Sequence, residues 1–318
     1  MRRGKLELNA SGKINISLDV TGKRKDGYHY IHSRMQNIGI SDRVIIGTSS
    51  ETSKNYCFIK GVAVEFCMKD STIPCDMNNL AVRGAAKIIE RVEEKHPGLS
   101  KEILKEPILI EITKKIPVAS GLAGGSADAA VTMLGINELL GSPLCLKELM
   151  DAGILVGSDV PYSLMMNSKV NEDRLDLKGK RSFAGIVTGI GELVKPVEPI
   201  KKNIILMNPG TQVSTKEIYE EVDRRIPSIY KGDVSFKEES LFYNILEECT
   251  LSLCDEAREL KDWMKKNLNA EQILMSGSGP TIVAYYEDDS SADRDTVIAK
   301  EAAMKQKNWK VYRTVSGV

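Results

Sequence analysis

Length, composition and charge exclude several classes of protein. The 318 residues are 42% hydrophobic and 28% charged, the composition of a globular protein with a substantial core and room for two domains. The 44 basic side chains balance the 44 acidic ones, so no net charge attracts nucleic acid or an anionic membrane surface. A small molecule is therefore the expected partner, with neither nucleic acid nor a membrane.

The cysteines and the hydrophobic runs favour a cytoplasmic protein. None of the six cysteines is spaced as C-x-x-C, and the three histidines are not arranged beside them as zinc ligands, so reduced thiols are expected. The basic N-terminus lacks a continuous apolar core, and no later run approaches the ~20 apolar residues that span a bilayer.

The first residues of the chain predict a hairpin. In KINISLDV (residues 13–20) apolar and polar residues alternate, which is typical of a half-buried strand with one polar face, and this face carries Lys13 and Asn15. The following KRKDGYHY reverses at Asp26-Gly27, and SRMQNIGI resumes the sheet.

A glycine-rich loop, IPVASGLAGGSADAA (116–130), follows a predicted helix (78–96) and a predicted strand, PILIEIT (107–113). Four apolar residues at or after its end recur at the spacing of a helix that packs on one face: Ala129, Met133, Ile136 and Leu140. We expect this helix to start near Ser126.

The start of this helix suits a phosphate. Its first N–H groups lack partners within the helix, and the helix dipole adds positive charge there. Gly121, Gly124 and Gly125 let the backbone approach an anion without a side chain in the way. Ser126 would cap the helix, or touch a phosphate oxygen or its metal. An ordinary loop-to-helix turn with a serine cap accounts for the pattern equally well.

Two known nucleotide motifs do not fit. A P-loop needs a lysine after its glycines, and none follows these. The dinucleotide fingerprint fits neither this loop nor GIGEL nor GSGPT, which disfavours a Rossmann dehydrogenase.

The rest of the chain alternates helices and strands. Helices are predicted at LCLKELMDAG (144–153) and in VGSDVPYSLMM (156–166), and residues 167–181 are polar without an apolar period, which predicts a surface loop or linker. Beyond it we expect a strand, a helix opened by the capping box Ser214-x-x-Glu217, further helices and a closing strand. This alternation indicates a two-domain α+β or α/β protein.

Three blocks together resemble the GHMP small-molecule kinase family: GKINISLDVTGKRKDGYH, IPVASGLAGGSADAA and MSGSGPTIVAYYE. Members of this family phosphorylate alcohols and acids with ATP on a fold without a P-loop. The resemblance implies an α+β, two-domain fold with mixed and antiparallel sheets. It implies an N-terminal ATP-binding domain at residues 1–168 and a C-terminal domain at 169–318.

The motifs KIN, DGYH and GSDVP are most similar to family members that phosphorylate the 2-hydroxyl of a methylerythritol carrying a cytidine diphosphate group, in non-mevalonate isoprenoid biosynthesis. The alternatives are a kinase for mevalonate, phosphomevalonate or homoserine, and a paralogue that binds nucleotide without catalysis. The chain departs from the family pattern where charged residues 169–181 are interposed before GIGE. A monomer or a weak homodimer is expected.

The resemblance implies that ATP and Mg²⁺ bind along the glycine-rich loop. The loop residues expected to contact ATP are Pro117, Gly121, Leu122, Ala123, Gly124, Gly125 and Ser126. Ser126 is also the candidate ligand of the magnesium ion. Asn79 matches a position near the adenine, although an asparagine there suits a helix cap equally well.

The catalytic pair implied by the resemblance is Asp159 and Lys13. An ionised Asp159 would accept the hydroxyl proton while Lys13 holds positive charge near the reacting oxygens. Taken alone, Asp159 would be interpreted as a helix N-cap and Lys13 as part of a solvated strand face.

Four further residues match positions that contact the substrate. His29 would hydrogen-bond the cytosine, because a group that both donates and accepts can distinguish cytosine from uracil, and Tyr28 would line the ring. Tyr219 would stack on the base, although a tyrosine on a helix is more often simple packing, and Asn15 would contact the methylerythritol hydroxyls.

Overall fold

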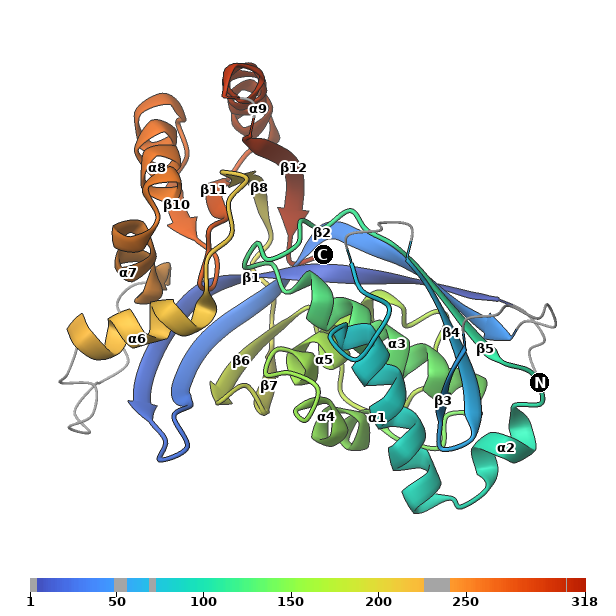
Figure 1. Ribbon diagram of the computed structural model, residues 1–318. Coiled ribbons are helices and arrows are strands. Elements are labelled where there is room, and N and C mark those ends of the chain that lie inside the picture. Colours follow the sequence, from blue (N-terminus) through green and yellow to red (C-terminus); the bar gives the residue numbers. More distant parts are fainter. Residues whose placement is uncertain (1–4, 49–55, 69–72, 226–240, 307) are drawn as a thin grey trace. The chain divides into compact units, whose positions relative to one another are not determined.

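The structure is a computed structural model that describes residues 5–48, 56–68, 73–225, 241–306 and 308–318 (Figure 1). In chain order its helices and strands are β1 (Leu6–Lys23), β2 (His29–Thr48), β3 (Tyr56–Ile59), β4 (Val62–Met68), α1 (Leu80–Lys95), α2 (Leu99–Ile103), β5 (Ile108–Thr113), α3 (Gly124–Leu139), α4 (Leu146–Gly153), α5 (Val160–Val170), β6 (Ala184–Gly189), β7 (Leu193–Val197), β8 (Lys202–Asn208), α6 (Thr215–Arg225), β9 (Tyr243–Asn244), α7 (Leu246–Leu253), α8 (Asp255–Asn267), β10 (Gln272–Met275), β11 (Ile282–Tyr286), α9 (Asp289–Lys305) and β12 (Lys310–Ser316). None of the helices in the described stretches is long and apolar enough to cross a bilayer.

The chain divides into two compact units, each assembled from separate stretches. The first unit comprises Met1–Gly12, Ile40–Val118 and Ala123–Phe183, and the second comprises Lys13–Gly39, Ala119–Leu122 and Ala184–Val318. Both contain strands and helices, which confirms the predicted α+β class. The chain changes unit within β1, within β2 and twice in the glycine-rich loop, so the predicted domains 1–168 and 169–318 stay a prediction.

In the first unit, β5 lies between β2 and β4. Ile110 of β5 pairs with Ile46 of the antiparallel β2 and with Phe66 of the parallel β4. β3 completes this side by pairing antiparallel with β4. Alternate residues of β5 are buried, so one face of the sheet is available to pack against helices.

The central helix of the first unit is α3, which packs against α1 and α5. It also approaches the sheet so closely that a Cβ added to Gly135 would stand 2.3 Å from Ile46 Cδ1. Every residue of α3 except Gly125, Glu138 and Leu139 is buried. The prediction that this helix packs on one face was therefore wrong, because neighbours cover almost all of it.

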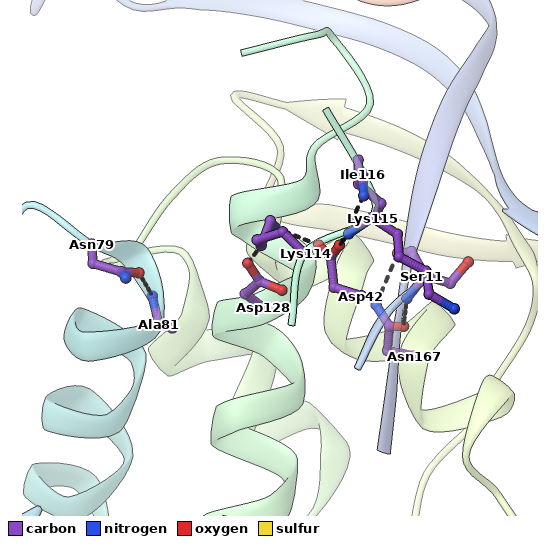
Figure 2. A network of polar contacts seen from close by, with 9 residues as sticks. All are labelled: Ser11, Asp42, Asn79, Ala81, Lys114, Lys115, Ile116, Asp128 and Asn167. Atoms are coloured by element: carbon purple, nitrogen blue, oxygen red, sulfur yellow. Dashed lines mark hydrogen bonds and ion pairs between the residues drawn. The ribbon is translucent and has the colours of Figure 1, made fainter. Parts of the chain in front are cut away.

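The polar segment after residue 166 is also more ordered than a surface loop. Its first four residues belong to α5, and Asn167 and Asn171 are buried. The Asn167 Oδ1 accepts a hydrogen bond from Ser11 N–H at 2.8 Å, and the Asn171 Oδ1 accepts one from Asn9 N–H at 2.9 Å (Figure 2 shows the Asn167 pair). These side-chain amides bond the backbone of β1 in the place of a neighbouring strand. The polarity of the segment did not predict such a buried role.

In the second unit, β1 and β2 form the predicted hairpin. The Arg24 N–H donates to Tyr28 O at 2.6 Å, and the Gly27 N–H donates to Arg24 O at 3.1 Å, which confirms the reversal at Asp26-Gly27. The polar residues of KINISLDV are buried together with the apolar ones. The prediction of a half-buried strand was therefore wrong, because further strands and turns of this unit cover its polar face.

The second unit also contains an antiparallel sheet in the order β10-β11-β8-β12, with α8 and α9 packed on it. Elsewhere in this unit β6 pairs with β2, β7 with β6 and β9 with β1. Its core includes apolar residues of β8 and β11 and of helices α6, α8 and α9: Ile205, Met207, Ile218, Leu260, Ile282, Ala284 and Ala299. The sheet continues from β12 to β2 through the pair of Ser316 with Ile38. The turn between β10 and β11 carries the SGSGPT residues.

We expect Asn167→Ala to lower the free energy of unfolding by about 1–3 kcal/mol, because the Ser11 N–H would stay buried and lose its acceptor. Urea unfolding followed by circular dichroism measures this change. The control is Asp173→Asn, since the Asp173 side chain is 75% exposed and its removal should change stability by less than about 0.5 kcal/mol. Equal effects of the two substitutions would contradict the structural role of Asn167.

Candidate active site

The Lys13 side chain is buried on β1 in the second unit, with only 4% of the residue exposed. Its ammonium donates to Asn15 Oδ1 at 2.7 Å, which confirms that the two side chains point the same way. Asn15 Nδ2 donates in turn to Ser33 Oγ at 2.8 Å on β2. Lys13 is therefore held in place, and its interpretation as part of a solvated strand face was wrong.

Residues from each of the three sequence blocks that suggested a family meet within the second unit. The Lys13 N–H donates to Leu122 O of the glycine-rich loop at 3.0 Å. Ser276, in the turn between β10 and β11, accepts from Asn15 N–H at 3.4 Å and donates to Gly121 O at 3.2 Å. The lysine, the loop and the SGSGPT turn thus share one hydrogen-bonded network.

The contact between Gly121 and this turn leaves no room for a side chain. A Cβ added to Gly121 would stand 2.4 Å from Ser276 O and 2.9 Å from Gly279 O, and its φ of +77° is in the left-handed region. Asn244 fixes the other side of the turn, because its Nδ2 donates to Met275 O and Gly277 O, both at 2.8 Å. Two backbone turns are therefore locked together.

In the first unit, α3 begins at Gly124, two residues before the predicted start. Its N-cap is Ala123, which has φ of +54° and no polar side-chain atom. Ser126 lies inside the first turn, so the prediction that it caps the helix was wrong. The first hydrogen bond of the helix runs from Ala127 N–H to Ala123 O at 2.9 Å. The N–H groups ahead of it point out of the helix end, where an anion would meet them.

A buried lysine with two aspartates holds the strand that leads into the loop (Figure 2). The Lys114 ammonium donates to Asp128 Oδ2 of α3 at 2.5 Å and also to Asp42 Oδ2 of β2. The other oxygen of Asp42 accepts from the N–H groups of Lys115 at 2.5 Å and Ile116 at 2.8 Å. This triad fixes the residues immediately before the loop to the sheet and to α3.

Burial dominates the electrostatics of this triad. It raises the pKa of the Asp128 carboxyl to about 7, and although the Lys114 charge opposes this, the Asp42 charge adds to it. Burial alone would lower the pKa of Lys114, but the two carboxylates outweigh it and raise that pKa. The lysine therefore stays charged, and Asp128 is the member of the triad that gains a proton near neutral pH.

Asn79 caps α1, the ordinary role that the sequence allowed. Its Oδ1 accepts from Ala81 N–H at 2.9 Å (Figure 2), and its Nδ2 donates to Pro74 O at 2.9 Å. The helix-cap interpretation is confirmed, and a contact of Asn79 with adenine stays a prediction.

Asp159 occupies the N-cap position of α5 without a capping hydrogen bond from its side chain. Its charge acts on Tyr162 in the next turn, whose pKa is raised well above the usual value by burial and also by Asp159. Tyr162 itself donates to Phe183 O at 3.0 Å. Asp159 therefore stands at the predicted N-cap position, but its carboxylate does not cap the helix.

His29 and Tyr219 lie together in the second unit. Their rings stack with centroids 4.9 Å apart, and His29 Nε2 lies 2.6 Å from Asp223 Oδ1. Tyr28, the neighbour of His29, is 59% exposed. The predicted base-binding residues are thus brought into one region of this unit, with Asp223 added to them.

Sequence reasoning missed the side chains that hold the predicted ones in place: Ser33, Asp42, Lys114, Asp128, Asp223, Asn244 and Ser276. Asp128 and Ser276 lie inside two of the sequence blocks that suggested the family, so their positions in those blocks could have identified them. Asp42 and Asp223 are single acids far along the chain from their partners, and no local pattern marks them.

Two protein-family models and several named proteins match the chain. The model of the GHMP kinases N terminal domain matches residues 79–167, and that of the GHMP kinases C terminal matches residues 226–302. The chain is 35% identical over 302 residues to a 4-diphosphocytidyl-2-C-methyl-D-erythritol kinase of Geobacillus sp. (strain WCH70), covering 91% of both chains. It is 32% identical over 314 residues to the enzyme of that name from Clostridioides difficile (strain 630), covering 95% and 92%.

Solved structures show the same fold. A 4-(cytidine 5'-diphospho)-2C-methyl-D-erythritol kinase has a TM-score of 0.69 at 23% identity, covering 98% of this chain and 100% of the other. A homoserine kinase from Cytophaga hutchinsonii has a TM-score of 0.63 at 17% identity, covering 100% and 96%. These likenesses confirm the predicted fold.

We expect Gly121→Ala to lower the free energy of unfolding by about 3 kcal/mol or more, because the methyl group would overlap the Ser276 carbonyl in a left-handed conformation. The control is Gly125→Ala, whose Cβ would stand 3.5 Å from Leu80 Cδ1 and which should be neutral or stabilise by up to about 1 kcal/mol. Both are measured by urea unfolding, and a tolerated Gly121→Ala would show that the two turns are not locked.

A second prediction concerns Asp128 and pH. Between pH 4 and 7 the folded protein keeps a proton on Asp128 that the unfolded chain releases, so this group makes stability fall as pH rises through that window. Each pKa unit of the shift corresponds to about 1.4 kcal/mol. Asp128→Asn should therefore lose less stability than the wild type between pH 5 and pH 8 in denaturant titrations. Parallel curves would contradict the raised pKa.

Proposed function

Because the chain belongs to the GHMP kinase family and is an ATP-dependent small-molecule kinase, we propose that its acceptor is the 2-hydroxyl of 4-diphosphocytidyl-2-C-methyl-D-erythritol, in isoprenoid biosynthesis. Relatives with that name are 31–35% identical over about 90% of the chain, which supports this acceptor over other alcohols. The structural observation that supports a kinase site is the network that joins Lys13, Gly121 and Ser276 within one unit.

The phosphates of ATP would lie on the backbone between Gly121 and Ser126. Three residues of this loop have positive φ, Ala119, Gly121 and Ala123, and two of these are not glycine. Such conformations cost energy and persist where the surrounding structure demands them. The uncapped start of α3 directly after Ala123 supplies N–H groups and the positive end of the helix dipole.

Asp159 and Lys13 would divide the work of phosphoryl transfer. The 2-hydroxyl oxygen forms a bond to the γ-phosphorus, the bond from that phosphorus to the bridging oxygen breaks, and ADP leaves. Asp159 takes the proton of the hydroxyl, and Lys13 balances negative charge on the reacting oxygens. Asn15 would position the Lys13 ammonium and keep one amide hydrogen for a substrate hydroxyl.

Magnesium would be held mainly by the phosphates and water, with Ser126 as the protein ligand. The described part of the chain contains no group of three or more His, Cys, Asp or Glu side chains placed to hold a metal ion. Magnesium usually keeps several waters and few protein ligands, so a single hydroxyl in the first turn of α3 fits it. When bound, the ion would neutralise charge on the phosphates.

The cytidine end of the substrate would bind at His29 in the second unit. Tyr28 is exposed beside it and presents an aromatic ring to solvent. Tyr219 packs on the His29 ring, so we propose that it supports this residue as well as the base. A shallow, open hollow of the surface is lined by Lys23, Arg24, Lys25 and Asp223, and it would receive the diphosphate because three of its side chains are basic.

We expect ADP release from ATP and Mg²⁺ only with the cytidyl substrate, and not with mevalonate, homoserine or no acceptor. Asp159→Asn should lower kcat by about 100- to 10,000-fold, because the hydroxyl loses its proton acceptor. A coupled ADP assay measures both.

The matched control is Asp151→Asn on α4, because the Asp151 side chain is exposed and pairs only at the surface with Lys147 at 2.5 Å. It should keep the wild-type rate. Turnover of another alcohol would reject the proposed acceptor and retain the kinase. If Asp159→Asn kept the wild-type rate, Asp159 would not be the base. If the wild-type protein released no ADP with any acceptor, a paralogue that binds nucleotide without catalysis would be favoured.

A further inference from the structure

A carboxylate holds one nitrogen of the His29 ring. Asp223, in the last turn of α6, has its Oδ1 2.6 Å from His29 Nε2, and the Lys23 ammonium donates to its other oxygen. The His29 side chain is only 7% exposed, while that of Asp223 is 20% exposed. The ring is thus fixed from one side, and Asp223 reaches the surface hollow that it lines with Lys23.

The ionised state of Asp223 decides which nitrogen of the ring carries the proton. Burial acts to raise the pKa of this carboxyl, but hydrogen bonds from Lys23 and His29 outweigh it and lower the pKa. An ionised carboxylate only accepts hydrogen bonds, so Nε2 must be the nitrogen that donates. In a neutral ring, Nδ1 is then left with a lone pair and acts as an acceptor.

The helix α6 presents Tyr219 and Asp223 together, because residues four apart lie on the same helix face. Tyr219 stacks on the His29 ring at an interplanar angle of 28°, while Asp223 bonds its edge. The stacking fixes the plane of the ring, and the carboxylate fixes its rotation within that plane. The direction of Nδ1 is therefore determined by two side chains of one helix.

We propose that Asp223, supported by Lys23, sets the base specificity of the enzyme by keeping the proton of His29 on Nε2. Nδ1 then accepts a hydrogen bond from the exocyclic amino group of cytosine and faces the O4 of uracil with a lone pair. Cytosine presents a donor at this position, whereas a uracil-type base presents an acceptor. The interaction with Nδ1 is therefore attractive for cytosine and repulsive for uracil. Asp223 is a positioning residue, and this inference rests on the proposed acceptor.

The tautomer is tested without turnover by long-range ¹H–¹⁵N spectra of the histidine side chains at pH 8. The chain has three histidines, and His29→Gln assigns the signals of His29. In the wild type we expect the pattern of a ring protonated on Nε2. In Asp223→Asn the amide offers an acceptor or a donor, so both tautomers should appear. An unchanged tautomer in Asp223→Asn would overturn the inference.

Specificity is tested by kcat/KM for the cytidine substrate and for its uridine analogue. We expect the preference for cytidine to fall by about 10-fold or more in Asp223→Asn, mainly through a higher KM for the cytidine substrate, because a mismatched hydrogen bond at the base discriminates on this scale. Asp223→Glu, which keeps a carboxylate, should restore part of the preference. Glu220→Gln is the matched control, because Glu220 lies on α6 and its side chain is 55% exposed.

Other outcomes separate this inference from the proposed function. A fall in kcat with both substrates, at an unchanged ratio, would mean that Asp223 is only structural and would overturn the inference. If the wild type turned over neither substrate, the proposed function would fail. Calorimetric binding of CDP and UDP to the wild type and to Asp223→Asn would then still decide the role of Asp223: an equal CDP preference in both would reject it.

Discussion

Two backbone turns in the second unit approach so closely that neither has space for a side chain between them. Gly121 faces the carbonyl groups of Ser276 and Gly279, and Ser276 returns a hydrogen bond to Gly121. The N–H groups of Lys13 and Asn15 bond to this pair of turns. The position of the proposed catalytic lysine therefore depends on a contact made by glycine, and the left-handed conformation of Gly121 is part of that dependence.

Buried polar groups around the candidate site are paired in different ways. Lys114 is compensated by two carboxylates in the first unit, while the Lys13 ammonium bonds a neutral amide oxygen in the second. Lys114 ties β2, α3 and the residues before the loop together, and removing it would leave two acids buried side by side. The Lys13 ammonium is anchored through Asn15 to Ser33 of β2, so its position would be fixed when it acts on phosphate oxygens.

Local patterns were sufficient to predict much of this fold. The hairpin reversal at Asp26-Gly27, the helix capped by Asn79 and the strand before the glycine-rich loop follow from spacing and turn chemistry over a few residues. Burial was predicted less well, because the period of α3 is the same whether one face or the whole helix is covered. The bond from His29 to Asp223 spans 194 residues, so nothing in the sequence near either residue marks it.

The buried amides of Asn167 and Asn171 link the two ends of the first unit in the order in which the chain is synthesised. They supply hydrogen-bond partners to the backbone of Asn9 and Ser11, which are made about 160 residues earlier during synthesis. The beginning of β1 therefore leaves the ribosome long before these partners exist, and a domain generally folds as one unit. The hydrogen bonds of Asn9 and Ser11 to these amides therefore cannot form until the end of α5 has been synthesised.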